Sequence, residues 1–301
     1  MNKILLLFVD GVGIGGENAE YNPLFSMKFF TEYLRFVPTK NNASFSDVNF
    51  ELFPVDAKMG VEGLPQSGTG QTAIFTGVNA SQFVGKHFGP YPYSTLRPIL
   101  EEQSIFRKFK EAGKQVEFAN AYPKIYFDHL ENAGLKVGAI AYAAMKAGLT
   151  LHTVEDLLTG KAISAEFTNR RWVNKLNYTI PQISPEQAAE NIISLSKSND
   201  LTVFEYFYPD YLGHKRIADE FDELVGEFDR FLIHLFANYP PDATLLLCSD
   251  HGNFEDSSVK THTMNDSLTI AKGPFAKEAK HNILSLTDIA PFLYNIAGLQ
   301  G

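Results

Sequence analysis

Short, uninterrupted apolar runs recur along the chain and are separated by amphipathic stretches. The runs lie at residues 3–9, 115–119, 201–206 and 244–248. Apolar runs of this length are typical of strands that are buried on both faces of a parallel sheet. We therefore expect strands at these four positions.

Helical patterns lie between the apolar runs. Residues 104–112 and 218–238 are amphipathic, and the Ser-Pro-Glu-Gln sequence at 184–187 is typical of a helix start. Strands that alternate with helices indicate an α/β fold. We expect a three-layer sandwich in which helices cover both faces of a mostly parallel central sheet.

The sequence contains no internal repeat, low-complexity tract or long linker. We therefore expect one domain over residues 1–301, a length that a single large α/β domain can fill. The least regular interval is 120–183, which includes the polar and basic stretch 168–171. We interpret this interval as a small lid or insertion within the domain. The alternative is an ordinary surface subdomain.

The composition is that of an ordinary globular protein, with 45% hydrophobic and 20% charged residues. The formal net charge of −9 argues against a nucleic-acid partner, because sequence-independent binding depends on Lys and Arg that neutralise phosphates. The apolar run at 4–9 is too short for a signal-peptide core or a membrane span, so we expect a cytoplasmic protein without a membrane partner. The single cysteine, Cys248, excludes an intrachain disulfide and is expected to be buried.

Acidic residues follow three of the predicted strands. Asp10, Asp210 and Asp250 come directly or shortly after apolar runs. In open α/β sheets, ligands bind beyond the carboxyl ends of the strands. A single carboxylate in such a position is often only a turn residue, so the evidence lies in the residues that accompany each one.

Three histidines accompany these carboxylates. His214 lies four residues after Asp210, a spacing that places both side chains on one face of a helical turn. His251 directly follows Asp250, and His262 comes shortly afterwards. Aspartate and histidine are the ligands expected at a hydrolytic Zn²⁺ or Mn²⁺ site, so the grouping predicts a site for divalent metal.

The segment 63–77 begins as a glycine- and proline-rich loop and continues at 71–76 with residues that can form a helix. A hydroxyl just before a helix start lies where backbone N–H groups and the helix dipole stabilise an anion. Ser67 and Thr69 both meet this requirement. Either could be a nucleophile, and either could be only an N-cap.

Together these motifs resemble the alkaline phosphatase superfamily. They are most similar to its branch that contains cofactor-independent phosphoglycerate mutase, phosphopentomutase and the nucleotide pyrophosphatase/phosphodiesterases. The resemblance covers roughly the first 90 and the last 100 residues, a core of domain size. The matching segments are 10–13, 67–77, 210–214, 249–253, 261–263 and 285–291.

Position by position, the resemblance implies two divalent metal ions, Zn²⁺ or Mn²⁺. One would be held by Asp210, His214 and His262, and the other by Asp10, Asp250 and His251. The nucleophile of the family lies ten residues before the glycine that matches Gly77, and this register assigns the role to Ser67, at or between the metals. The backbone around Gly68 is then expected to hold a nonbridging phosphate oxygen.

The resemblance implies phosphoryl transfer through a phosphoserine on a small phosphorylated substrate. The two mutase groups carry a large cap between the positions of Ser67 and Asp210, whereas this chain has room for a small one. A mutase must shield its phosphoryl group from water, so we expect a phosphatase or phosphodiesterase. Three alternatives remain: a phosphomutase, favoured by the short interval between His251 and His262, an enzyme acting on sulfate or phosphonate, and a non-catalytic metal-binding module.

Two arginines in the irregular interval are candidates for substrate binding. Arginine can hold a second phosphate or a carboxylate through a planar, bidentate contact. We expect Arg170 or Arg171 to contact the part of an anionic substrate that does not react. The alternative is a pair of surface charges, with the neighbouring Trp172 packing the segment onto the core.

Overall fold

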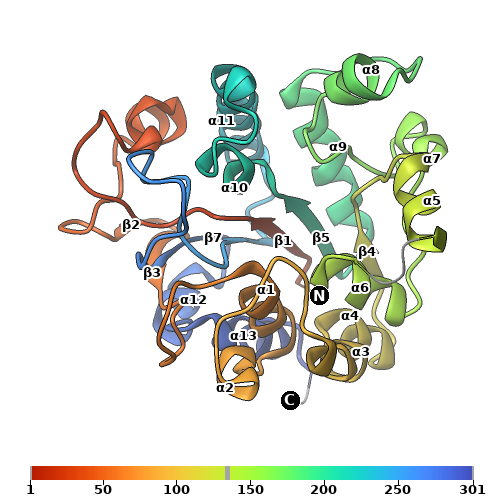
Figure 1. The fold of residues 1–301 in the computed structure, drawn as a ribbon, viewed down its shortest axis with the longest axis horizontal. Helices are drawn as coiled ribbons and strands as arrows, with labels where there is room; N and C mark the ends of the chain where they lie inside the picture. The colour runs from red at the N-terminus through yellow and green to blue at the C-terminus, as the bar shows by residue number, and fades with distance from the viewer. Residues whose placement is uncertain (1, 133–135, 300–301) are drawn as a thin grey trace.

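The computed structural model describes residues 2–132 and 136–299. Within them the chain forms one seven-stranded sheet with the strand order β2-β3-β7-β6-β1-β5-β4 (Figure 1). The strands are β1 (Ile4–Val9), β2 (Phe45–Asp47), β3 (Phe50–Val55), β4 (Val116–Phe118), β5 (Leu201–Tyr206), β6 (Thr244–Cys248) and β7 (Ser267–Lys272).

The centre of the sheet is parallel, as the apolar runs predict. β1 pairs in parallel with both β5 and β6, and β4 pairs in parallel with β5. β7 and β2 run in the opposite direction. The predicted mostly parallel α/β fold is therefore confirmed, while the strands β2, β3 and β7 at one end of the sheet have no counterpart in the sequence-based expectation.

Alternate residues of β1 face two separate hydrophobic cores, which makes the fold a three-layer sandwich. Ile4, Leu6 and Phe8 belong to one core, and the intervening residues of the strand belong to the other. The first core is covered by α1 (Ser67–Thr76), α3 (Arg97–Gln103), α4 (Ile105–Glu111), α6 (Ala139–Lys146), α12 (Ala276–Asn282) and α13 (Ile289–Ile296). The second is covered by α9 (Pro185–Ser198) and α11 (Phe221–Asn238).

Short helical segments complete the layers. They are η1 (Pro23–Ser26), η2 (Phe29–Tyr33), α2 (Ala80–Val84), η3 (Ser94–Leu96), α10 (Tyr208–Gly213), η4 (Ala218–Glu220) and η5 (Leu286–Asp288). The predicted helices near 104, 184 and 218 are present, and Ser104 and Ser184 are the N-caps of their helices. Among the described residues, no helix combines the length and apolarity that a membrane crossing requires.

The interval 120–183 divides into two parts. α6 lies inside the first core, where residues 139–144 are buried. The remaining helices are α5 (Lys124–Asn132), α7 (Val154–Leu158) and α8 (Arg170–Leu176), which lie beside the β4 edge of the sheet (Figure 1). Trp172 of α8 packs in a small cluster with Leu157, Ala121 and Ala162. Tyr126, Phe127 and Leu130 of α5 also pack against the first core, and a lid or insertion within 120–183 stays a prediction.

Phe167 joins the segment before α8 to the second core. Its ring is fully buried, and its centroid lies 4.0 Å from that of Phe231 on α11 and 4.5 Å from that of Tyr206 on β5. The position of α8 relative to the sheet therefore depends on this stack of aromatic rings.

Phe167→Ala should lower the free energy of unfolding by about 3–5 kcal/mol, because it removes a large side chain from a site that cannot collapse fully. Urea unfolding followed by circular dichroism measures the change. Phe83→Ala on α2 is the matched control, since Phe83 is 58% exposed, and it should change stability by less than about 0.5 kcal/mol. Equal losses for the two variants would contradict this role for Phe167.

Candidate metal centre

Three neighbouring parallel strands end at one edge of the sheet and carry the acidic residues. Asp10 directly follows β1, Asp210 lies on α10 just after β5, and Asp250 follows β6. Because β5, β1 and β6 are adjacent and parallel, their carboxyl ends meet, and the three carboxylates converge.

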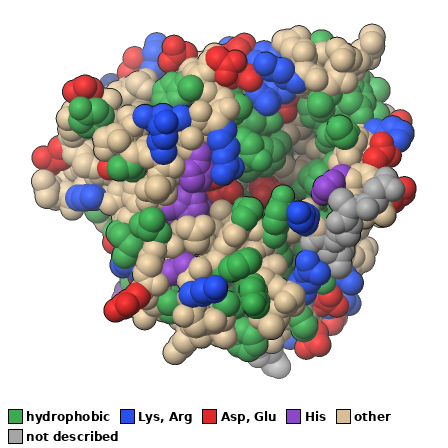
Figure 2. Space-filling model, in the orientation of Figure 1, with side chains coloured by type: hydrophobic (Ala, Val, Ile, Leu, Met, Phe, Trp, Pro, Cys, Tyr) green, Lys and Arg blue, Asp and Glu red, His purple; other side chains and the backbone are tan. Residues whose placement is uncertain are grey.

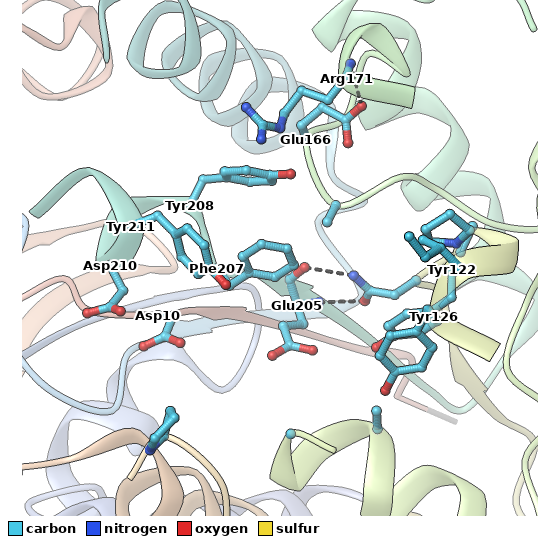
Figure 3. Close-up of a pocket in the computed structure, with 18 of the residues that line it drawn as sticks. Asp10, Tyr122, Tyr126, Glu166, Arg171, Glu205, Phe207, Tyr208, Asp210 and Tyr211 are labelled. Atoms are coloured by element: carbon cyan, nitrogen blue, oxygen red, sulfur yellow. Dashed lines mark hydrogen bonds between the residues drawn. The ribbon is translucent and has the colours of Figure 1, made fainter. Parts of the chain in front are cut away.

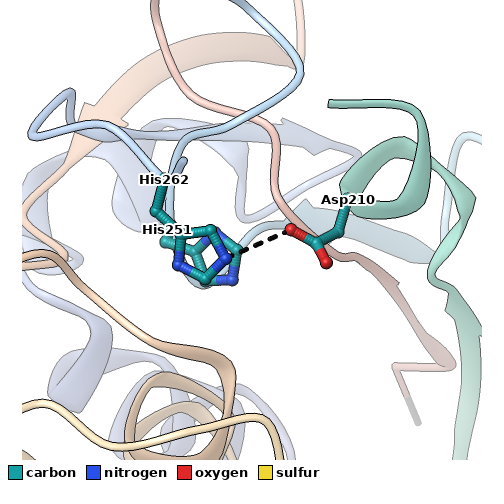
Figure 4. A group of neighbouring side chains, drawn as sticks. All are labelled: Asp210, His251 and His262. Atoms are coloured by element: carbon teal, nitrogen blue, oxygen red, sulfur yellow. Dashed lines mark ion pairs between the residues drawn. The ribbon is translucent and has the colours of Figure 1, made fainter. Parts of the chain in front are cut away.

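A first group of ligand atoms is formed by Asp210, His214 and His262. Asp210 Oδ1 lies 3.3 Å from Nε2 of His214 and 3.3 Å from Nε2 of His262, and the two Nε2 atoms are 3.1 Å apart. His251 stacks on His262 with ring centroids 3.8 Å apart (Figure 4). The mutual distances suit three side chains that converge on one cation.

A second group is formed by Asp10, Asp250 and His251. His251 Nε2 lies 3.3 Å from Asp10 Oδ1 and 3.6 Å from Asp250 Oδ2. Ser67 Oγ lies 3.0 Å from the same nitrogen. The structure thus brings together every ligand position that the sequence singles out, with the Ser67 hydroxyl beside the histidine of the second group.

Backbone carbonyls orient the histidines. Nδ1 of His262 lies 2.6 Å from the carbonyl oxygen of Pro65, and Nδ1 of His214 lies 2.7 Å from that of Lys260. A carbonyl can only accept a hydrogen bond, so it selects the tautomer that carries its proton on Nδ1. The lone pair of Nε2 is then directed into the site, as a metal ligand requires.

The two aspartates of the second group lack donors for one oxygen each. Asp10 Oδ1 and Asp250 Oδ2 are buried and receive no hydrogen bond in the described part of the chain. Burial, together with the charges of Asp250 and Asp210, raises the pKa of Asp10 well above its usual range. Burial also opposes ionisation of Asp210, yet the neighbouring His262 and His251 hold the pKa of that carboxyl far below normal. Buried acceptors without donors are what a bound divalent cation would satisfy.

Helix α1 begins at Ser67, four residues earlier than the sequence suggests. Gln66 is the N-cap residue and makes no side-chain cap, so neither Ser67 nor Thr69 acts as the N-cap. Gly68 allows the early start, because a Cβ there would lie 2.3 Å from the carbonyl oxygen of Tyr91. Thr69 Oγ1 instead donates to the Gln66 carbonyl and accepts from the Phe88 N–H, which holds the following loop against the helix.

Residues outside the expected ligand set fix the loops that carry the ligands. Glu255 is buried and accepts hydrogen bonds from Gly13 N at 2.9 Å, Asn253 N at 2.8 Å, Thr263 Oγ1 at 2.6 Å and Asn265 Nδ2 at 2.7 Å. Asn253 Nδ2 donates to Asp210 Oδ1 at 2.7 Å. Neither residue was expected to take part in the site, although Asn253 ends the matching segment 249–253 and Glu255 lies two residues beyond it.

The comparison with known families assigns the chain to a superfamily. The model of the Metalloenzyme superfamily matches residues 2–300, which is nearly the whole chain. The chain belongs to the Metalloenzyme superfamily. Membership implies that the protein binds divalent metal. In agreement, the candidate ligand atoms form two groups that share His251, one with Asp210 and His262 and one with Asp10 and Asp250, and His214 adjoins the first through Asp210 and His262.

Individual relatives are distant. The 2,3-bisphosphoglycerate-independent phosphoglycerate mutase of Mycoplasmopsis synoviae (strain 53) is 28% identical over 123 residues, which are 40% of this chain and 25% of the mutase. The aligned part thus spans a quarter of that relative's length. PH0037 protein from Pyrococcus horikoshii has a TM-score of 0.55 at 12% identity, with 100% of this chain and 98% of that chain covered. The alkaline phosphatase from the Antarctic bacterium TAB5 has a TM-score of 0.54 at 12% identity, with both chains covered completely. The two structures show a shared fold.

A pocket of about 580 Å³ opens beside the candidate metal ligands of this metalloenzyme. Figure 2 shows the hollow, with histidines along one side, acidic side chains at its floor and hydrophobic side chains on the opposite side. Asp10, Ser67, Asp210, Arg171 and Trp172 are among the residues that line it. Figure 3 shows Asp10 and Asp210 across the pocket from Arg171 of α8.

The two candidate arginines have different surroundings. Arg171 lines the pocket, with its guanidinium over the ring of Tyr208 and an ion pair to Glu220. Arg170 is not among the described lining residues, and its guanidinium pairs with Glu220, Glu223 and Glu227 beside α11. Arg170 thus ties α8 to the core, and only Arg171 is placed to face a ligand.

Glu205 is a further pocket residue that the sequence analysis missed. It lies on β5 and faces the pocket, and its carboxyl has no hydrogen bond or ion pair among the described residues. Burial and the charge of Asp250 raise the pKa of Glu205 to about 7. A glutamate inside an apolar strand with acidic residues nearby was the only signal available in the sequence.

Protein purified without chelators should contain about two divalent ions per chain, because two groups of buried acceptors need cations. Asp250→Asn and His262→Ala should each reduce the metal content measured by elemental analysis. His234→Ala is the control, since His234 pairs with Glu190 on the surface of α11. No metal in the wild-type protein, and none after incubation with Zn²⁺ or Mn²⁺, would contradict the site.

The raised pKa of Glu205 should make the chelator-treated protein less stable as the pH rises. The folded state holds the Glu205 proton up to a pKa of about 7, whereas the unfolded state releases it near 4.5. Between these values the folded state binds more protons, so the free energy of unfolding falls with increasing pH, by roughly 1–3 kcal/mol for this group.

Glu205→Gln should remove this contribution and stabilise the protein more at pH 8 than at pH 5, as urea unfolding would show. Glu186→Gln is the matched control. The hydrogen bond from Arg230 lowers the pKa of Glu186 to about 2, so this control should have nearly the same effect at both pH values. A pH-independent effect of Glu205→Gln would rule out the raised pKa.

Proposed function

We propose that this metalloenzyme is a metal-dependent phosphoester hydrolase that acts through a phosphoserine on Ser67. The observation that carries the proposal is the position of the Ser67 hydroxyl. It lies at the first residue of α1, buried, and 3.0 Å from the histidine of the second ligand group. A hydroxyl beside metal ligands and at a helix N-terminus is suited to attack an electrophilic phosphorus.

The two cations, Zn²⁺ or Mn²⁺, would be held by the two groups of side chains. Asp210, His214 and His262 would hold one, and Asp10, Asp250 and His251 would hold the other. When bound, they supply positive charge that favours an alkoxide on Ser67 and offsets the charge on the phosphoryl oxygens.

The chain's own residues would then perform a double displacement. Ser67 loses its proton to solvent, and Oγ forms a bond to phosphorus while the bond to the leaving oxygen breaks. The leaving oxygen takes up a proton from water. In the second half, a water molecule attacks the phosphoserine and releases phosphate, which restores the Ser67 hydroxyl. The net reaction consumes one water for each phosphoester bond.

The first turn of α1 can hold the phosphoryl group during these steps. The backbone N–H groups of Ser67 and Gly68 have no acceptor among the described residues, and both point from the start of a ten-residue helix. Such N–H groups bind phosphate oxygens. We propose that Gly68 N–H contacts a nonbridging oxygen and that Arg171, which also lines the pocket, contacts the remainder of a small phosphorylated substrate.

Two other functions remain candidates. A phosphomutase is supported by the similarity to a phosphoglycerate mutase over 123 residues. Hydrolysis is favoured because the pocket is an open hollow at the protein surface (Figure 2), whereas a mutase must exclude water from its phosphoenzyme. A non-catalytic metal-binding module would have no use for a serine hydroxyl beside the ligands.

Ser67→Ala should reduce the hydrolysis of p-nitrophenyl phosphate with added Mn²⁺ or Zn²⁺ by several orders of magnitude, because the covalent step is lost. Folding and metal content should stay close to wild type. Thr69→Ala is the matched control, because the Thr69 hydroxyl contacts only the backbone of Gln66 and Phe88. It should cost about 1 kcal/mol of stability and much less activity.

The two variants show whether Ser67 or Thr69 is the nucleophile. A larger loss of activity in Thr69→Ala than in Ser67→Ala would show that the nucleophile is misassigned. Metal binding by a wild-type protein that releases no phosphate from any phosphoester would favour the non-catalytic module. Transfer of phosphate within a substrate, without release to water, would favour the mutase.

A further inference from the structure

Aromatic and apolar side chains dominate the pocket beyond the metal-binding residues. Four of the exposed large hydrophobic side chains of the described chain line this one pocket, namely Tyr91, Ile125, Leu176 and Tyr211. Exposed apolar side chains that gather in one concave site indicate a ligand with an apolar part. A phosphate and two metals account only for the part of the pocket beside the candidate metal ligands.

The aromatic rings form two walls. Tyr122 and Tyr126 stack with ring centroids 4.2 Å apart at the β4 side. Phe207 lies 4.6 Å from Tyr208 and 5.5 Å from Tyr211 at the α10 side. Figure 3 shows the walls on either side of the pocket, and among the described residues no aromatic contact joins one wall to the other. A flat ring bound between the walls would contact the faces or edges of their rings.

Glu205 lies at the floor between the walls. In Figure 3 its carboxyl follows Asp210 and Asp10 in a row and precedes Tyr126. Burial is the largest cause of the raised pKa of Tyr122 and Tyr126, and the charge of Glu205 is the next largest. Glu205 therefore lies close to the Tyr122/Tyr126 wall. A carboxyl without a protein partner in a pocket can accept a hydrogen bond from a hydroxyl or N–H group of a ligand.

The backbone of Glu205 is held in place by Asn120. Asn120 Nδ2 donates to the Glu205 carbonyl, and Asn120 Oδ1 accepts from the Glu205 N–H, both at 2.8 Å. Asn120 lies two residues beyond the end of β4 and is buried, so its amide continues the pairing of β4 with β5 by side-chain atoms. The backbone position from which the Glu205 side chain enters the pocket is therefore fixed.

Cationic side chains are absent from this floor in the described lining. The lining lysines and arginines are Arg171, Lys175 and Arg216. Arg171 lies over Tyr208, and Arg216 lies over Tyr211, while Lys175 pairs with Glu220. At a pH above the raised pKa of Glu205, a second anionic group between the walls would meet the charge of Glu205 without a neutralising partner, which costs binding energy.

We propose that the pocket selects phosphoesters whose leaving group is uncharged and carries a planar aromatic ring, as in a nucleoside monophosphate. The ring lies between the Tyr122/Tyr126 wall and the Phe207/Tyr211 wall, and Glu205 accepts a hydrogen bond from a hydroxyl or N–H group of the leaving group. This inference rests on the proposed phosphoester hydrolase activity and assigns its substrate class.

The test compares phosphate release from three substrates by the metal-supplemented enzyme. Adenosine 5′-monophosphate has an uncharged leaving group with an aromatic ring, glycerol 3-phosphate lacks the ring, and 3-phosphoglycerate carries a second anion. We expect kcat/KM to be at least about tenfold higher for adenosine monophosphate than for the other two, which corresponds to one or two ring contacts and one hydrogen bond to a charged group.

Two variants assign the preference to residues. Tyr126→Leu should lower kcat/KM for adenosine monophosphate about two- to tenfold and leave glycerol phosphate nearly unchanged. At a pH of about 8.5, above the raised pKa of Glu205, Glu205→Gln should lower kcat/KM for adenosine monophosphate and raise it for 3-phosphoglycerate, because the repelling charge is gone. The matched controls are Tyr33→Leu and Glu186→Gln, both at surface positions away from the pocket, and neither should change the ratios.

Binding of adenosine to the chelator-treated protein provides a readout without catalysis. Calorimetry should show binding of adenosine to the wild type and weaker binding to Tyr126→Leu. Equal kcat/KM for adenosine monophosphate and glycerol phosphate, or a preference for 3-phosphoglycerate, would overturn the substrate class while leaving the hydrolase intact. Phosphate release from none of the substrates would overturn both the hydrolase and the substrate class.

Discussion

The geometry of the candidate metal centre depends on the hydrogen bonds that the buried carboxylate of Glu255 accepts. It accepts hydrogen bonds from Gly13, Asn253, Thr263 and Asn265, and so joins the segments that follow β1, β6 and the loop before β7. Each of these segments carries or adjoins a candidate metal ligand. Hydrogen bonds to a charged acceptor are stronger than neutral ones, and loss of a buried donor's only partner is costly. The loops therefore keep their positions before any cation binds.

The buried carboxylates of this site differ in whether all of their oxygens receive hydrogen bonds. Glu255 is buried and has a donor for each of its lone-pair directions, so its charge is already compensated. Asp10 and Asp250 are buried beside it, yet one oxygen of each receives no hydrogen bond among the described residues. The difference arises because backbone and amide donors surround Glu255, whereas the two aspartates face one another and His251. Cation binding can offset the free-energy cost of burying these two aspartate oxygens without hydrogen-bond donors.

Local sequence was sufficient for the parallel strands β4, β5, β1 and β6 and insufficient for the antiparallel end of the sheet. β1, β5 and β6 are apolar runs buried on both faces, and the acidic residues after them converge because parallel strands end at one edge. β3 and β7 pair antiparallel at the far end, where the pattern is less uniform. The start of α1 at Ser67 depends on the close approach of Tyr91 to Gly68, a tertiary contact that no local propensity contains. The role of Asn120 at Glu205 is of the same kind, since a side chain replaces strand pairing.

The metal centre and the floor of the pocket are held by separate hydrogen-bond networks, and this has a consequence for substrate specificity. The metal side of the site is fixed by Glu255 and the loops after β1 and β6, whereas the floor of the aromatic pocket is fixed by Asn120 at the β4 edge. The two networks share no residue, so substitutions that leave the coupled charges of Asp250, Asp10 and Glu205 unchanged should add across the two networks. Leaving-group preference can therefore change at positions such as Tyr126 without disturbance of the ligand geometry. In the proposed enzyme, the candidate metal ligands are held near the sheet centre and the proposed substrate wall lies at the sheet edge, so the leaving-group preference can vary while the candidate metal centre is kept.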